Sequence, residues 1–173
     1  FNDDISNWDV SNVIYMGAMF ENASSFNQDI SNWDVSNVID MSFMFKNASS
    51  FNQDISNWDV SNVTNMIEMF LFAESFNGNI SSWDVSNVLY MNGMFKDAES
   101  FNQNLSSWDV SSVTNMAWMF AHQGAFNNAG FPLNWNTSNV TNMEWMFYAS
   151  NFDQDISTWD VSNVAKMNQM FYG

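Results

Sequence analysis

The chain has 173 residues and carries 19 aspartates and glutamates against three lysines, with no arginine, for a formal net charge of −16. This charge disfavours nucleic acid as a partner, because phosphate binding depends on Lys and Arg, and it disfavours adhesion to anionic lipid. The remaining partner classes are cations, basic protein surfaces and neutral polar molecules such as glycans. Hydrophobic residues make up 46% of the chain and aromatic residues 17%, so a folded core is expected.

Cysteine and long apolar segments are both absent from the sequence. The lack of cysteine excludes a disulfide framework and cysteine-ligated zinc, but it does not fix the compartment. No apolar run approaches the roughly 20 residues of a membrane span, so membrane insertion is not expected. The sequence opens on Phe1 rather than Met, and no signal-peptide pattern is expected among these residues. We therefore expect a mature or excised segment of a longer protein.

A repeat of 25 residues runs through the whole chain. The stretch FNQDISNWDVSNV begins at Phe26 and again at Phe51, and it returns twice more with small changes. All 14 methionines fall into pairs three residues apart, each followed by phenylalanine, as in Met41, Met44 and Phe45. This register predicts a single solenoid over residues 1–173. The seven expected repeats are 1–25, 26–50, 51–75, 76–100, 101–125, 126–151 and 152–173.

Two hydrophobic periods occur within each repeat. Around NWDVS, Trp33 and Val35 alternate with polar residues, which predicts a short strand with one apolar and one polar face. After it, apolar residues recur at steps of three and four from Val38 to Ala48, which predicts a short helix. We therefore expect an α/β repeat solenoid with short parallel strands on one face and short helices on the other.

The repeat motif resembles a known family. The stretch FNQDISNWDVSNVTNM, together with MF and ASSF, is similar to the short tandem repeats of bacterial surface proteins and mycoplasma-type lipoproteins, a family of unknown function related to BspA-type leucine-rich repeats. The resemblance covers the whole chain. It implies a leucine-rich-repeat-like solenoid on a cell surface, with no catalytic residues to carry over. In repeat six, NNAGFPLNWNTSNV adds residues before Trp135 and replaces the usual Asp and Val by Asn136 and Thr137, so a local bulge is expected.

One acid follows the tryptophan of almost every repeat. These acids, called the Asp column below, are Asp9, Asp34, Asp59, Asp84, Asp109 and Asp160. They alternate with core residues and are expected to point outward, where neighbours about 5 Å apart repel by nearly 1 kcal/mol in water. Two arrangements would offset this repulsion. Each carboxylate could accept hydrogen bonds from Ser or backbone N–H at the following turn, or cations such as calcium could bind along the column.

Asparagine recurs at other fixed positions of the repeat. We interpret the asparagines after each anchor phenylalanine, such as Asn27, and those before the valine, such as Asn37, as structural links to the backbone of the coils. Asn32 and Asn57 precede two of the tryptophans. They extend the polar strand face, and together with the Asp column they form the expected binding face.

Aromatic residues occupy several outer positions of the predicted helix side. Trp118 and Trp145 hold the same position in adjacent repeats, so they are expected to stack. We expect a contact patch at these positions, unless flanking side chains cover them. Its residues are Phe43, Phe72, Trp118, Trp145 and Tyr148.

The motifs argue for a protein that is not an enzyme. His122 is the only histidine, and no nucleophile elbow, phosphate loop or HExxH motif occurs. No cofactor is expected. We expect a non-enzymatic extracellular or cell-surface repeat protein that acts in adhesion or recognition of a protein or glycan surface through its polar, acidic face. The alternative is a structural building block of a fibre, in which solenoids associate head to tail or side by side.

Overall fold

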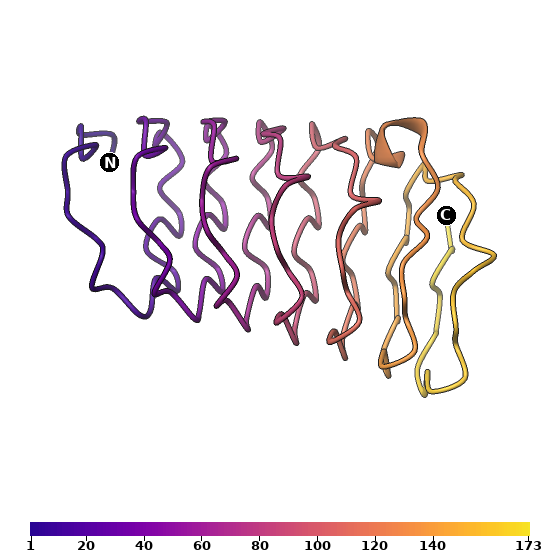
Figure 1. Ribbon diagram of the computed structural model, residues 1–173. Helices are drawn as coiled ribbons and strands as arrows, with labels where there is room; N and C mark the ends of the chain where they lie inside the picture. The colour runs from indigo at the N-terminus through magenta and orange to yellow at the C-terminus, as the bar shows by residue number, and fades with distance from the viewer.

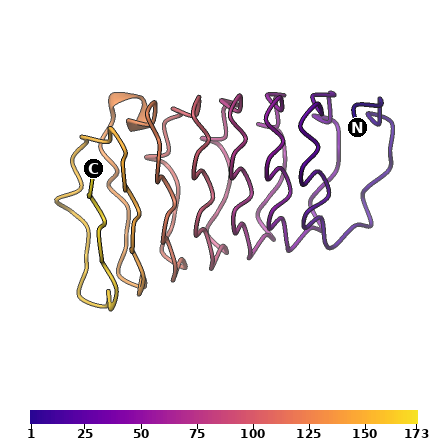
Figure 2. The same ribbon diagram turned by 180° about the vertical axis from the view of Figure 1, so that it is seen from behind.

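The computed structural model describes all residues 1–173 and shows a row of coils stacked side by side, with the N-terminus in the first coil and the C-terminus in the last (Figure 1). The view from behind shows the same row (Figure 2). Backbone hydrogen bonds join each coil to the next. The N–H of Met41 donates to the carbonyl oxygen of Asn65 at 3.0 Å, and the N–H of Phe43 donates to that of Ile67 at 2.8 Å. The repeat nature of the chain is thus confirmed.

The prediction of a strand and a helix in each repeat is wrong. The only regular element is the short 3-10 helix η1 (Asn128–Gly130), and the coils meet through isolated parallel bridges instead of a sheet. The bridges link one residue of each coil to its equivalent in the next: Tyr15, Asp40, Asn65, Tyr90, Asn115, Asn142 and Lys166. The chain is therefore not an α/β solenoid with leucine-rich-repeat-like strands and helices.

Left-handed backbone conformations exclude the predicted helix. Phe43 has a φ of 60° and Asn47 a φ of 58°, values that an α-helix of L-residues does not contain. The N–H groups of Phe43 and Asn47 donate to the next coil, whereas those of Met44 and Ala48 donate to the carbonyl three residues earlier. Consecutive tight turns therefore replace the helix. They bury Met44 and Ala48 at nearly the same spacing as a helix would, which explains why the apolar pattern misleads.

Turns also replace the predicted strand at NWDVS. The N–H of Trp33 donates to the carbonyl oxygen of Ile30 at 3.2 Å, and the N–H of Ser36 donates to the carboxylate of Asp34 at 3.1 Å. Because these groups are used within the coil, no backbone ladder joins adjacent coils here. A side chain makes the link instead: the indole Nε1–H of Trp58 donates to the carbonyl oxygen of Ile30 at 3.1 Å.

Two ladders of phenylalanine rings run through the core. Anchor rings of successive coils stack, as Phe51 and Phe76 do with 5.9 Å between centroids. The rings that follow the methionine pairs also stack, as Phe45 and Phe70 do at 5.5 Å. The two ladders contact each other, with 4.0 Å between the centroids of Phe45 and Phe51. One continuous cluster of 47 buried residues results, so each coil gains its core from its neighbours.

The sixth repeat forms the local bulge that the sequence predicts. The added residues form η1, and the amide of Asn128 is fully buried there. Its Oδ1 accepts the N–H of Leu105 at 2.6 Å, and its Nδ2 donates to the carbonyl oxygen of Phe131 at 2.7 Å. Thr137, which replaces the usual valine, is also buried, and its hydroxyl donates to the carbonyl oxygen of Asp160 at 2.9 Å. Polar contacts therefore bind the bulge to both neighbouring coils.

Candidate functional site

Each aspartate of the Asp column lies at the start of a tight turn and accepts hydrogen bonds from the serine two residues later. At Asp59, the carboxylate accepts the N–H of Ser61 at 3.1 Å and its hydroxyl at 2.6 Å. The sequence DVS forms this turn because Asp can fold back on the backbone two residues on. All six carboxylates are exposed at the surface. The hydrogen-bonded alternative that the sequence left open is therefore present in the structure.

These hydrogen bonds hold much of the Asp column in its charged form. The side-chain hydroxyl of Ser86, followed by its backbone N–H, lowers the pKa of Asp84 below its ordinary value. Ser111 lowers the pKa of Asp109 in the same order of causes, although the charge of Asp84 acts against it. A donor that favours the carboxylate over the neutral acid has this effect.

All three lysines make their charged contacts away from the Asp column. Lys46 forms ion pairs with Glu68 at 2.9 Å and Glu21 at 3.8 Å, and Lys166 lies 3.8 Å from Glu144. Those side chains belong to the part of the coil around the methionine pairs. Lys96 lies over the ring of Trp118, as described below. No ion pair involves the Asp column, so its charge is left uncompensated by the protein.

The same turn recurs at two further repeat positions, which were not assigned to this turn from the sequence. Asp54 binds the N–H of Ser56 at 2.9 Å, and Asn79 makes the equivalent bond to Ser81 in the next coil at 3.1 Å. At the bridge positions, Asp40 binds the N–H of Ser42 at 2.8 Å. The equivalent residues Asn65, Asn115 and Asn142 make the same turn. Tyr15, Tyr90 and Lys166 interrupt this second column. The signal was Asp or Asn at one fixed repeat position, since both side chains offer the same acceptor oxygen.

The Asp column does not gather its carboxylates around a common point. No group of three or more His, Cys, Asp or Glu side chains is arranged to hold a metal ion. Each carboxylate instead faces its own serine within its own coil, as Asp34 faces Ser36. Calcium, which takes six to eight oxygen ligands, would find too few protein oxygens at any single step of the column.

The asparagines after the anchor phenylalanines and those before the valines make hydrogen bonds between adjacent coils. The Oδ1 of Asn27 accepts the backbone N–H of Asn52 at 2.9 Å, and the Nδ2 of Asn62 donates to the carbonyl oxygen of Ser36 at 2.8 Å. The structural interpretation of these two asparagine columns is confirmed.

The binding-face asparagines differ from these structural ones. Asn32 and Asn57 are exposed, and no hydrogen bond involves either side chain. Each stands two residues before an acid of the Asp column, so free amide groups accompany the carboxylates on this surface. Amides both donate and accept hydrogen bonds, whereas ionised carboxylates only accept.

The expected contact patch divides into a cluster and two separate residues. Trp118 and Trp145 stack as predicted, with 4.7 Å between ring centroids and 5° between planes. Tyr148 meets Trp145 edge-on at 4.9 Å, and the Lys96 ammonium lies 4.4 Å from the Trp118 ring centre. These three aromatic side chains are half-buried. The three rings and the Lys96 side chain therefore shield much of one another from solvent. Sequence reasoning did not identify Lys96 as part of this cluster.

Phe43 and Phe72 lie outside that cluster. Phe43 is half-buried beneath the Lys46 ammonium, which is 5.0 Å from its ring centre. Phe72 is 40% exposed and lines a shallow hollow with Asn47, Ser49 and Glu74. Neither ring stacks with Trp118 or Trp145, so the structure does not bring the five residues into one surface.

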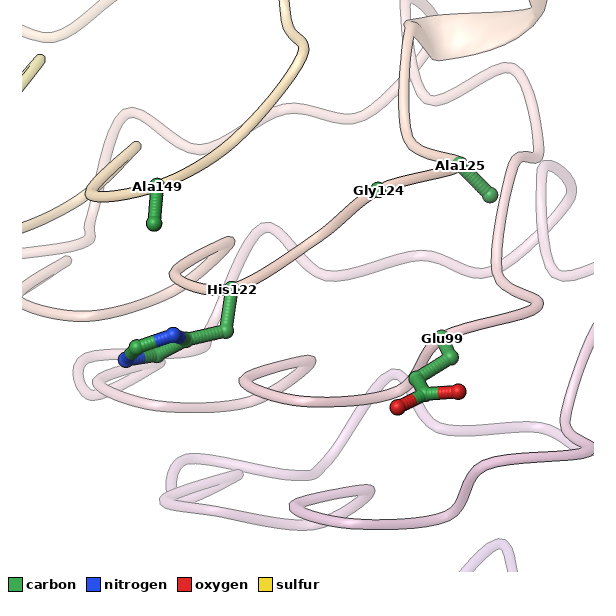
Figure 3. Close-up of a pocket in the computed structure, with 5 residues that line it drawn as sticks. All are labelled: Glu99, His122, Gly124, Ala125 and Ala149. Atoms are coloured by element: carbon green, nitrogen blue, oxygen red, sulfur yellow. The ribbon is translucent and has the colours of Figure 1, made fainter. Parts of the chain in front are cut away.

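A second shallow hollow lies beside the only histidine (Figure 3). It is lined by Glu99, His122, Gly124, Ala125 and Ala149, and the His122 ring and Glu99 carboxylate lie apart in this view. The His122 ring packs edge-on against Tyr148, with 5.1 Å between centroids. No hydrogen bond joins the His122 ring to an acid or hydroxyl group. The hollow thus lacks the hydrogen-bonded base and nucleophile that acyl-transfer sites use.

No helix of the structure has the length and apolarity needed to cross a bilayer.

A family model described as "Mycoplasma protein of unknown function, DUF285" matches the chain in three tandem segments, residues 1–74, 53–131 and 132–173. No curated protein and no solved structure matches the chain. The three matches together span the whole sequence.

Proposed function

We propose a function for this chain, which belongs to the DUF285 family of Mycoplasma proteins of unknown function. It is a non-enzymatic protein of the cell surface that acts in recognition or adhesion. The observation that carries the proposal is the Asp column, whose exposed carboxylates repeat from coil to coil without a compensating lysine. We also propose that the chain is related to BspA-type repeats, a relationship that rests on the repeat motif alone.

The chemistry of the Asp column favours a basic protein surface over a neutral glycan. Each exposed carboxylate offers only a weak contact in water, worth well under about 1 kcal/mol at physiological salt. Several such contacts in register add up, because after the first contact the remaining ones form within a single complex. Complementary charge also speeds encounter and excludes acidic partners. The exposed amides of Asn32 and Asn57 add hydrogen-bond donors that carboxylates lack.

Binding by the Asp column can be tested without disturbing the fold. In coil six the chain itself carries Asn136 in place of the usual aspartate, and its Oδ1 still accepts the N–H of Ser138 at 3.2 Å. Asparagine therefore keeps the turn and removes the charge. The triple variant Asp59→Asn, Asp84→Asn and Asp109→Asn applies this replacement to three consecutive coils.

Binding is measured to a polylysine-coated surface and to an array of uncharged glycans, at low and high salt. The control variant Glu74→Gln, Glu99→Gln and Asp153→Asn removes the same number of charges at other exposed positions. We expect the column variant to lose most binding to polylysine and the control variant to keep it. Equal loss in both variants would show a simple net-charge effect and would refute recognition by the column. Binding to glycans that survives in the column variant would move the partner to that class.

Self-association into a fibre is the second candidate, and one exposed apolar pair favours it. Leu89 and Tyr90 are adjacent in the fourth coil and are 37% and 43% exposed. The preceding coil carries Thr64 and Asn65 at these positions, and the following coil carries Thr114 and Asn115. The variant Leu89→Thr, Tyr90→Asn therefore repeats a pair that the fold already accepts. If lateral contact builds a fibre, sizing across a range of concentrations will show assembly of the parent chain and monomers of the variant.

A further inference from the structure

We propose that Asn77 is a site of spontaneous covalent modification, where the chain converts its own asparagine to aspartate and isoaspartate. The sequence contains two Asn–Gly pairs, Asn77–Gly78 and Asn92–Gly93, and both lie in the fourth repeat. In such a pair the backbone nitrogen of glycine can reach the asparagine side-chain carbonyl carbon, because glycine has no Cβ to hinder the approach. The surroundings of the two pairs differ in the folded protein.

Gly78 is half-buried and borders a shallow hollow that is open to solvent. The equivalent positions in neighbouring coils carry Gln53 and Gln103, which reach back to the preceding coil. Gly78 has no side chain, and a shallow hollow lined by Asn52, Gln53, Asp54, Ser56, Asn77, Gly78 and Asn79 opens at this place. The N–H of Gly78 makes no hydrogen bond. It can therefore lose its proton to hydroxide without any local opening of the fold.

The Asn77 side chain is oriented by two donors from the next coil. Its Oδ1 accepts the backbone N–H of Asn102 at 3.0 Å and the Nε2–H of Gln103 at 2.8 Å. Two N–H groups aimed at a carbonyl oxygen stabilise the negative charge that develops there when its carbon is attacked. The Nδ2 of Asn77 makes no hydrogen bond, so its departure breaks no contact.

The reaction needs only water and hydroxide. The deprotonated nitrogen of Gly78 attacks the Cγ of Asn77, the C–N bond to the side-chain nitrogen breaks, and that nitrogen leaves with the proton it gains from water as ammonia. The product is a five-membered succinimide. Water then adds to one of its two carbonyl carbons and opens the ring. Opening at one carbon gives aspartate, and opening at the other gives isoaspartate, whose backbone is one carbon longer.

Asn92–Gly93 supplies an internal control. The N–H of Gly93 donates to the carbonyl oxygen of Ala117 in the next coil at 2.8 Å, and Gly93 is buried. Its φ of 64° forms part of the left-handed turn. Deprotonation and attack there require the fold to open first, which makes the folded protein protect this pair.

The test follows both pairs by peptide mass mapping while the whole purified chain is incubated at mildly alkaline pH. Isoaspartate is detected separately by enzymatic methylation. We expect conversion at Asn77 to exceed that at Asn92 by at least about tenfold in the folded chain, since only Gly93 needs local opening. In denaturant the two rates are expected to become similar. Equal rates in the folded chain, or faster reaction at Asn92, would overturn the proposal.

Two variants separate the chemistry from simple exposure. Gln103→Ala removes one donor to the Asn77 carbonyl and is expected to slow conversion at Asn77 severalfold, with no change at Asn92. Gly78→Ala is expected to slow it further, although its Cβ would meet the Phe76 ring at 2.9 Å and its melting temperature must be compared with that of the parent. If Gln103→Ala reacts at the parent rate, the donors play no part and the proposed site geometry is wrong.

Discussion

The indole Nε1–H of Trp58 donates a hydrogen bond to the carbonyl oxygen of Ile30 in the preceding coil, at 3.1 Å. The same bond recurs at five further tryptophans: Trp33, Trp83, Trp108, Trp135 and Trp159. Tryptophan here joins adjacent coils as a backbone ladder does in a sheet, and it gives the buried Ile30 carbonyl a second donor beside the N–H of Trp33. The same side chain also fills the core between coils.

Replacing Trp58 by Ala is therefore expected to destabilise the fold by roughly 3–5 kcal/mol, as for other large aromatic side chains in cores. Trp58→Phe keeps most of the packing but removes one of the two donors to the Ile30 carbonyl, which costs about 0.5–1.5 kcal/mol, while the N–H of Trp33 remains as the other donor. Denaturant unfolding measures both losses. Trp8 is the matched control, because it is 54% exposed and makes no indole hydrogen bond. A loss at Trp58→Ala as small as that at Trp8→Ala would contradict the assigned role.

Alanine-to-glycine changes are predicted to have opposite signs at two positions of the turns. Ala18 is exposed with a φ of 57°, whereas Ala48 is fully buried and is not left-handed. Ala18→Gly relieves about 1–2 kcal/mol of strain from the left-handed conformation, but it raises the conformational entropy of the unfolded chain. The folded state is therefore expected to gain up to about 1 kcal/mol in stability. Ala48→Gly is expected to lose about 0.5–1 kcal/mol from backbone entropy, plus lost packing. Thermal unfolding gives both signs, and losses at both positions would contradict the turn assignment.

Acid is predicted to weaken the fold through the serine-bound aspartates. The Ser86 hydrogen bonds lower the pKa of Asp84 in the folded chain. A lowered pKa adds stability above the ordinary aspartate value of about 3.9, and this stability is lost as the pH falls through that value toward the folded pKa. Urea unfolding at neutral and acidic pH measures the loss. High salt is needed, because protonation also relieves repulsion among the acids.

The variant Ser86→Ala tests the cause of that pH dependence. The hydroxyl of Ser86 is the largest contributor to the lowered pKa of Asp84, and it lies 2.6 Å from the carboxylate. Without it the pKa of Asp84 moves back toward its ordinary value, so the variant should lose less stability than the parent between neutral and acidic pH. An unchanged pH dependence would mean that the hydroxyl does not hold the charge.

The sequence allowed the repeat and its core to be predicted, but not the backbone path. The burial of Trp33, Val35 and Met41 followed from apolar periodicity, and burial is what such periodicity reports. The same spacing suits a succession of tight turns as well as a helix. The left-handed conformation of residues such as Phe43 distinguishes the turns from a helix. Because Phe43 is not a glycine, the sequence does not mark this conformation. Stacking against neighbouring coils stabilises it, and local propensity does not encode that contact.

The candidate site was predictable in its surface and not in its details. The exposure of the Asp column followed from its alternation with core residues. Its serine partners followed from the tendency of Asp in turns to accept a hydrogen bond from the residue two positions later. The aromatic cluster was only partly foreseen. Stacking of Trp118 on Trp145 followed from their shared repeat position, but the cover by Lys96 depends on a long side chain from the preceding coil. Such reach between coils is not visible in a single repeat.

Chelator is predicted to leave the melting temperature of the chain unchanged. Each carboxylate of the Asp column, such as Asp59 with Ser61, has its hydrogen-bond donors within its own turn. No three acidic or histidine side chains converge on one point, so a bound cation would have few protein ligands. Calorimetric scans of the chain with added calcium and with EDTA measure this directly, with the Asp59→Asn, Asp84→Asn, Asp109→Asn variant as control. A marked fall in melting temperature with EDTA that calcium restores in the parent but not in the variant would instead make the column a cation site.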